Sequence, residues 1–209
     1  MRIPLLYYIV LMSQLCTAIV GGFRYKSLSL PLKILEWLFI ISVVDTVGSW
    51  FLFSFHIHTF WPSHYYTLIE LVFITMIYIN WIKQQNKKTF FLLCLAGFTL
   101  LWIIGKFSFE PFSYSDDWTA TISKILQIAF SVFILIEVMQ ESDILWMNDP
   151  RLWVAISIIL YAAGTLFWFA LFNKMLQISP ERLRQSYSLN WILIIISNLF
   201  FIRSFLCKT

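Results

Sequence analysis

Seven long and almost uninterrupted apolar stretches constrain the fold of this chain more than any other feature. Each is close to the roughly 20 residues that a helix needs to cross the hydrocarbon core of a membrane. None alternates between polar and apolar residues, as the strands of a membrane barrel do. The pattern predicts an all-α polytopic membrane protein folded as a seven-transmembrane-helix bundle. The predicted spans are residues 3–22, 32–55, 65–82, 89–105, 119–140, 151–173 and 187–206.

The composition supports a membrane bundle over an unusually apolar soluble core. Of the 209 residues, 60% are hydrophobic and only 12% are charged, whereas about a quarter of the residues in a soluble domain are charged. Too few charged side chains remain to cover a water-exposed surface. The connections are short, so we expect residues 1–209 to form a single membrane domain without a soluble one.

The basic residues predict an orientation. Nine of the 15 Lys and Arg residues lie at the C-terminus or in the connections after the first, third and fifth stretches. Basic residues near the membrane favour the cytoplasmic side. We therefore expect the C-terminus in the cytoplasm and the N-terminus outside. Because the basic residues are scattered, the lipid bilayer is the expected partner, and no nucleic acid is expected.

Three charged residues lie well inside the apolar stretches and predict a polar site between the helices. Asp45 is about ten residues, or roughly 15 Å, from the end of its stretch, and Glu70 and Lys124 share a depth about five or six residues from the same side. A charge at such a depth costs about 2.5 kcal/mol or more, so it needs a partner or a wet cavity. We expect Lys124 to pair with Glu70, which leaves Asp45 either neutral or hydrated. By contrast, Glu36 and Glu137 lie near stretch ends and are expected to be interfacial.

Other polar side chains recur at helical spacing and complete the predicted site. Tyr66 shares the face of Glu70, and Gln127 follows Lys124 by three residues. Tyr161 and Asn190 belong to the polar faces of the sixth and seventh stretches. Such faces turn away from lipid, so the side chains should converge. A ligand or ion pocket and a structural ion pair both remain open at this point.

Histidines gather in one connection, at positions 56, 58 and 64. Histidine can bind zinc or respond to pH. His56, His58 and His64 have no cysteine beside them and match no metal motif, so they are only secondary candidates as ligands. We expect no metal, no cofactor and no catalytic residue.

The last third of the chain resembles a family of membrane proteins. Residues 148–173 and 189–207 are similar to uncharacterised bacterial seven-helix proteins, which themselves resemble the membrane segments of sensor histidine kinases. The resemblance implies a sensor in a bacterial inner membrane. It is carried by Pro150, Trp153, Tyr161, Gly164, Phe167, Phe169, Asn173, Asn190 and Asn198.

These features together favour a signalling role. We expect a receptor-like sensor that recognises a small molecule in the intramembrane polar pocket and acts through a separate partner protein. A small-molecule or ion transporter, or a channel component, is one alternative. The other is a membrane enzyme acting on lipid, with Asp45 and Glu70 as an acid and base pair.

Overall fold

A computed structural model of the chain contains seven α-helices and two short 3₁₀ turns, and no strand occurs in the part it describes. The described residues are 5–55, 60–113, 116–141, 146–178 and 180–207, with side chains throughout except at 53–54 and 168–187. The all-α prediction is confirmed. The elements are α1 (Leu5–Arg24), η1 (Tyr25–Ser27), α2 (Leu30–Ser54), α3 (Trp61–Trp81), α4 (Gln85–Ser108), α5 (Trp118–Gln140), η2 (Trp146–Asn148), α6 (Pro150–Ile178) and α7 (Pro180–Leu206).

Five of the helices are long and apolar enough to cross a membrane. They are α1, α4, α5, the Pro150–Phe167 part of α6 and the Ser188–Leu206 part of α7. This confirms the expected class, an integral membrane protein. The other two helices, α2 and α3, have 25 and 21 residues and contain three of the acidic residues, Glu36, Asp45 and Glu70.

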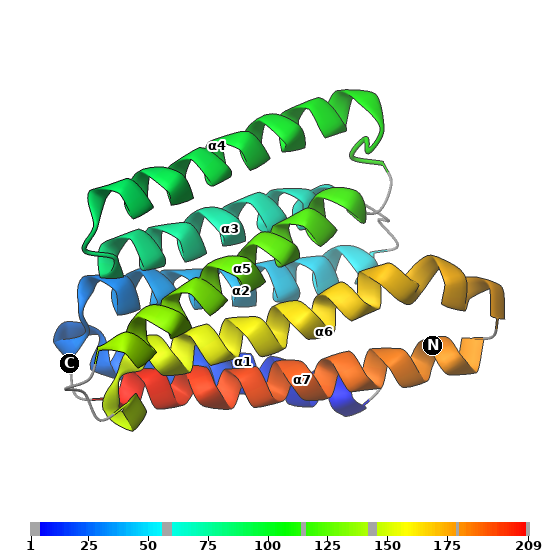
Figure 1. Cartoon of the computed structure of the whole chain (residues 1–209). Helices are drawn as coiled ribbons and strands as arrows, with labels where there is room; N and C mark the ends of the chain where they lie inside the picture. The colour runs from blue at the N-terminus through cyan, green and yellow to red at the C-terminus, as the bar shows by residue number, and fades with distance from the viewer. Residues whose placement is uncertain (1–4, 56–59, 114–115, 142–145, 179, 208–209) are drawn as a thin grey trace.

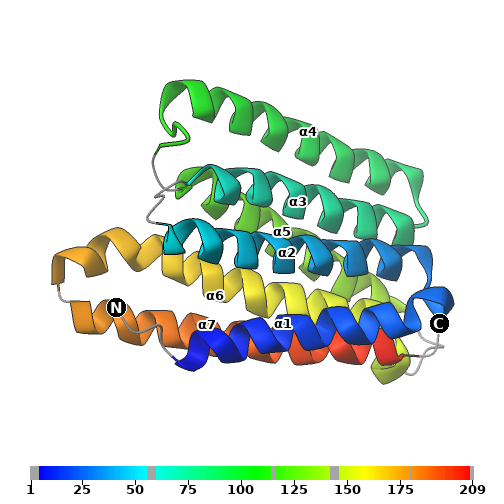
Figure 2. The same cartoon turned by 180° about the vertical axis from the view of Figure 1, so that it is seen from behind.

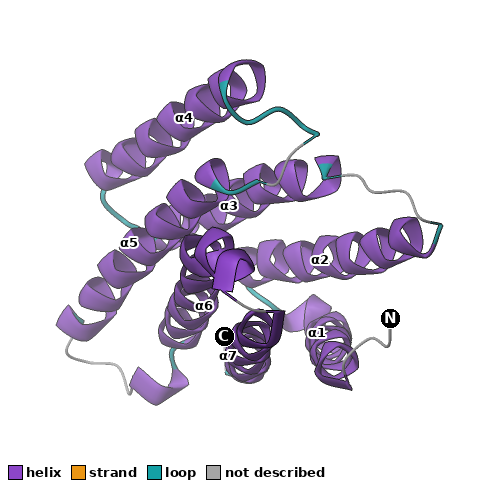
Figure 3. Cartoon of the chain, turned by 90° about the vertical axis from the view of Figure 1, so that its right-hand side faces the viewer, coloured by secondary structure: helices purple, strands orange, loops and turns teal. Residues whose placement is uncertain are grey.

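The helices run side by side, with α4 at one edge of the bundle and α1 and α7 at the other (Figures 1 and 2). Seen from one end, α2, α3, α5 and α6 meet in the middle while α4 lies outside them (Figure 3). The main neighbours of α4 are α3 and α5. The middle of the bundle is thus enclosed by helices that each carry a polar face.

The helices extend beyond several of the predicted spans. The largest difference is at residues 174–186, expected as a connection, where α6 continues to Ile178 and α7 begins at Pro180. Hydropathy predicts which part of a helix can lie in hydrocarbon. It does not predict how far the helix continues into polar sequence. Proline suits the start of α7, because the first helical position needs no N–H donor.

Glu36 is buried, which corrects the interfacial prediction for this residue. Its side chain lies between α1 and α7 and is 2% exposed, and its Oε2 atom is buried without a hydrogen-bond partner. The carboxylate rests on Gly21 of α1, where a Cβ would overlap it and would lie 3.0 Å from a ring carbon of Phe205. Gly21 is therefore required for the close approach of α1 and α2.

We expect Gly21→Ala to destabilise the bundle. The added methyl group must displace the buried Glu36 carboxylate, and overpacking of this kind costs about 1–3 kcal/mol. Thermal unfolding in detergent should show a lower midpoint for this variant. The matched control is Gly97→Ala in α4, where a Cβ meets nothing within 4 Å. Equal midpoints for the two variants would contradict the packing role of Gly21.

Candidate functional site

The centre of the bundle holds a buried ion pair between Glu70 of α3 and Lys124 of α5. Their side chains are 3% and 4% exposed, and the Lys124 ammonium donates a hydrogen bond to Glu70 Oε2. Gln127 donates a second hydrogen bond to the same oxygen, at 2.9 Å. The Lys124 ammonium also lies 4.3 Å from the centre of the Tyr161 ring of α6 and 3.3 Å from its hydroxyl oxygen. The structure thus brings four of the predicted residues together.

The pairing follows from helix geometry. On α5, Lys124, Gln127 and Ser131 are spaced three and four residues apart, so they share one face. All three are buried. On α3, Glu70 shares its face with Thr67, Leu71 and Ile74, which are also buried. A single buried charge in this position would be costly. Packing the face of α3 that carries Glu70 against the face of α5 that carries Lys124 lets the two charges neutralise each other.

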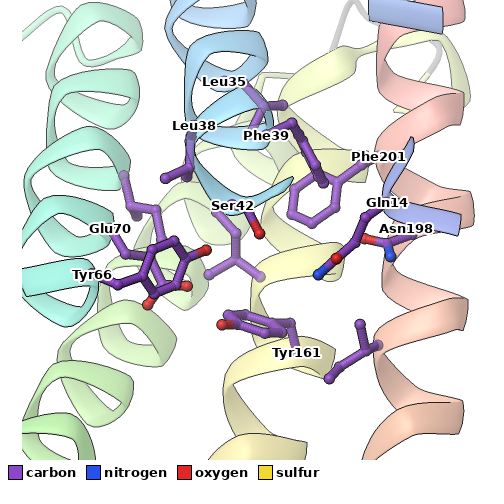
Figure 4. A pocket seen from close by; sticks show the side chains of 13 residues that line it. Gln14, Leu35, Leu38, Phe39, Ser42, Tyr66, Glu70, Tyr161, Asn198 and Phe201 are labelled. Atoms are coloured by element: carbon purple, nitrogen blue, oxygen red, sulfur yellow. The ribbon is translucent and has the colours of Figure 1, made fainter. Parts of the chain in front are cut away.

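A small cavity of about 50 Å³ adjoins the ion pair (Figure 4). This volume exceeds the roughly 10–15 Å³ that one water requires, so the cavity accommodates several water molecules or one small polar group. Its walls come from five helices: α1, α2, α3, α6 and α7. Apolar side chains such as Phe39 and Phe201 form much of the lining. The polar lining residues are Gln14, Ser42, Tyr66, Glu70, Tyr161 and Asn198.

A second hollow lies on the outside of the bundle, between α2 and α3, and contains Asp45. This lateral groove has a volume of about 290 Å³ and is lined by Ile41, Val44, Asp45, Gly48, Ser49, Leu52, Trp61, Pro62, Tyr65, Tyr66 and Ile69. Asp45 is partly buried there and interacts electrostatically with Glu70. Asp45 therefore lines the lateral groove, whereas Glu70 of the ion pair lines the central cavity.

Tyr66 lines both the lateral groove and the central cavity. Its hydroxyl lies near Ser42 of α2 and Tyr161 of α6. In Figure 4 the Tyr66 ring lies beside Glu70 and faces the side chains of α2 and α6. Tyr66 is thus shared by the groove that contains Asp45 and the cavity that adjoins Glu70.

Asn190 lies apart from these residues. Its carboxamide oxygen is buried without a partner and faces Gly164 of α6, so the side chain packs between α6 and α7 and does not line the cavity. The α7 residue at the cavity is Asn198, which donates a hydrogen bond to Ser13 Oγ at 2.8 Å. Gln14 of α1 and Ser42 of α2 also line the cavity without being among the predicted site residues.

Of the three histidines, His56 and His58 lie outside the described residues. His64 is in α3, is fully buried, and belongs to a second ionic cluster. Its Nδ1 atom contacts the Lys106 ammonium, which also donates to Glu110 Oε2 at 2.9 Å and to Asp116 Oδ1 at 3.3 Å. Thr119 adds a further oxygen, 3.1 Å from Lys106 Nζ. We refer to these five residues as the Lys106 cluster.

The Lys106 cluster has the ligand atoms of a metal site but contains its own cation. Ligand atoms of His64, Glu110 and Asp116 lie within 4.8 Å of one another. The ammonium of Lys106 contacts all three, and an ammonium has only three protons to donate. The Lys106 ammonium therefore occupies the position between these three side chains that a metal cation would take.

The carboxyl group of Glu110 is stabilised in its ionised form. Burial would raise its pKa, but hydrogen bonds from Thr119, Lys106 and the Trp118 backbone N–H, together with the Lys106 charge, hold the pKa below its usual range. The Trp118 N–H donates at 2.7 Å. Because Trp118 begins α5, the carboxylate also benefits from the positive end of the helix dipole.

The Lys106 cluster and the central ion pair are joined through α3 and α5. Thr67, one turn before Glu70, donates a hydrogen bond to Asp116 Oδ2 at 2.5 Å. Asp116 in turn attracts the charge of Lys124. Sequence inspection missed this cluster because Lys106, Glu110 and Asp116 lie where apolar stretches end and resemble ordinary loop residues. The four-residue spacing of Lys106 and Glu110 was the available signal.

No protein-family model, curated protein or solved structure matches the chain. The chemistry of the central site is therefore inferred from its own side chains. The central site offers one ion pair, two phenols, two carboxamides and a hydroxyl around a small cavity. This set can hydrogen-bond a small polar group and can respond to added charge.

Proposed function

We propose that the chain is a receptor-like membrane protein that binds a small molecule beside Glu70 and acts through a partner protein. The observation that carries this proposal is the cavity next to the Glu70–Lys124 pair, because five helices contribute to its walls. A ligand group in that position touches most of the bundle at once. Its binding can therefore change how the helices pack, which is what a receptor requires.

The proposal includes seven membrane spans. At 1.5 Å per residue, α2 and α3 are long enough for the roughly 30 Å hydrocarbon core. Both lie alongside the five apolar helices (Figure 1), and α3 packs against α2, α4 and α5. Their charged residues Glu36 and Glu70 are buried inside the bundle. We propose the same orientation as above, with the N-terminus outside a bacterial inner membrane.

A transporter is the second candidate, favoured by the continuation of polar contacts along α3 and α5. Beyond Gln127, the Ser131 hydroxyl bonds the Gln127 carbonyl at 2.7 Å and the Tyr78 hydroxyl at 2.6 Å. With the Lys106 cluster at the other end, buried polar groups follow much of the length of α3. Transport of a bound molecule across proteoliposomes would favour this candidate.

Native mass spectrometry of the protein purified in mild detergent tests the receptor proposal. We expect a small molecule to remain bound to the unmodified chain and to be lost from Ser42→Leu, which fills the cavity. Thr89→Leu, at an exposed site on α4, is the matched control and should retain it. Absence of any bound molecule, or its retention by the folded Ser42→Leu protein, would argue against the cavity as a binding site.

A further inference from the structure

Asp45 creates a charge imbalance at the central site. Lys124 pairs with Glu70, and Asp45 enters none of the ion pairs formed by the described residues. Counted with Glu70 and Lys124, the three groups carry a net charge of about −1 when ionised. A carboxylate at this depth needs a counter-charge or water. Asp45 therefore marks a place where an added cation would be stabilised.

The surroundings of Asp45 are apolar and aromatic. Trp61, Tyr65 and Tyr66 line the same groove, and aromatic faces attract cations. The groove opens on the outer surface, where Val44 is 66% exposed and Trp61 is 50% exposed. Its volume of about 290 Å³ is close to the lower limit of small-molecule pockets, about 300 Å³. An occupant would thus be mostly apolar with one cationic group.

We propose that the lateral groove binds a single-chain aliphatic amine that enters sideways from the bilayer and places its ammonium group against Asp45. The inference goes beyond the proposed receptor function, because it adds a second binding site that is separate from the central cavity and shares Tyr66 with it. The alkyl chain lies along the apolar wall of α2 and α3. The ammonium neutralises Asp45 and contacts the ring of Tyr66.

The charges of the site explain the choice of an amine. A fatty acid would add a third negative charge beside Asp45 and Glu70, and a fatty alcohol would leave Asp45 without a counter-charge. A zwitterionic lipid brings a phosphate as well as an amine, and the phosphate would be repelled. Of these amphiphiles, only the amine brings a net positive charge to Asp45.

Tyr66 links the occupied groove to the central cavity. Because its side chain lines both spaces, an ammonium at Asp45 contacts one side of Tyr66, and Ser42 and Tyr161 line the cavity on the other side. Tyr161 in turn contacts Lys124. A change in the position of Tyr66 is therefore expected to alter the contact between Tyr161 and Lys124, and so the ion pair between α3 and α5.

Equilibrium binding of radiolabelled dodecylamine to the protein in phosphatidylcholine nanodiscs tests the proposal. We expect saturable binding at one site, no saturable binding of dodecanol or dodecanoate, and at least about tenfold weaker amine binding for Asp45→Asn. Gly48→Leu should also abolish binding by filling the groove, since a Cβ at Gly48 meets nothing within 4 Å. Glu141→Gln is the control for charge loss away from the groove, and empty nanodiscs correct for partitioning.

Each outcome bears on a different part of the proposal. Equal amine binding by Asp45→Asn and the unmodified chain would overturn it, as would absence of saturable binding to the unmodified chain. If a co-purified molecule still occupies the central cavity in that case, the receptor function stands and only the amine site in the groove is wrong. Thermal unfolding of Gly48→Leu checks that the groove is filled without loss of the fold, which is expected because a Cβ there meets nothing within 4 Å.

Discussion

Replacing Lys106 by methionine is expected to cause one of the largest losses of stability available to this protein. Lys106 is the only cation among the described residues that contacts Glu110 and Asp116. Without it, the buried carboxyl groups of Glu110 and Asp116 lose the ammonium that they share. Removing one partner from a buried charge cluster costs about 3–5 kcal/mol, a large share of the stability of an average domain. The unfolding midpoint in detergent and the yield of folded protein should both fall sharply.

Lys87→Met is the matched control for this prediction. Lys87 lies near the other end of α4 and pairs with Glu137 of α5 at 2.6 Å, but its side chain is 33% exposed. Water screens such a pair, so its loss should cost about 1 kcal/mol or less. If the two variants lose the same stability, the buried Lys106 cluster does not stabilise the packing of α4 on the bundle more than an exposed ion pair does.

Much of the fold follows from hydropathy and helix geometry. Seven apolar stretches predicted seven helices, and the described residues form seven. Five of these helices are long and apolar enough to cross a membrane. The partnership of Glu70 and Lys124 followed from their matching depth, and the position of Gln127 followed from its three-residue spacing. These features depend on one helix at a time, or on one shared depth.

Features that depend on the contact between particular helices could not be predicted in the same way. Asn190 and Asn198 lie eight residues apart on α7 and look equivalent in the sequence. Only the packing of α7 against α1 and α6 decides that Asn198 lines the cavity and Asn190 faces Gly164. Glu36 near the start of α2 looked interfacial for a similar reason, since Gly21 of α1 provides its buried position.

The second large effect is expected at the central ion pair. Lys124→Met leaves Glu70 buried with one hydrogen bond from Gln127, in range of the negative charge of Asp45. Glu70→Gln instead leaves the Lys124 ammonium unpaired among Tyr161 and Gln127. Each single variant should lose about 3–5 kcal/mol of stability, measured by thermal unfolding in detergent.

The double variant Glu70→Gln/Lys124→Met separates a structural pair from a binding site. It removes both charges, so the stability of the bundle should return to within about 1–2 kcal/mol of the unmodified chain. Under the receptor proposal, its folded protein should still fail to retain the co-purified small molecule, because the polar group of the ligand has lost its charged partners. A double variant that regains both stability and ligand would show that the pair only sets how α3 packs against α5. A double variant that stays as unstable as the single variants would show that its side chains are needed for contacts beyond their mutual charge.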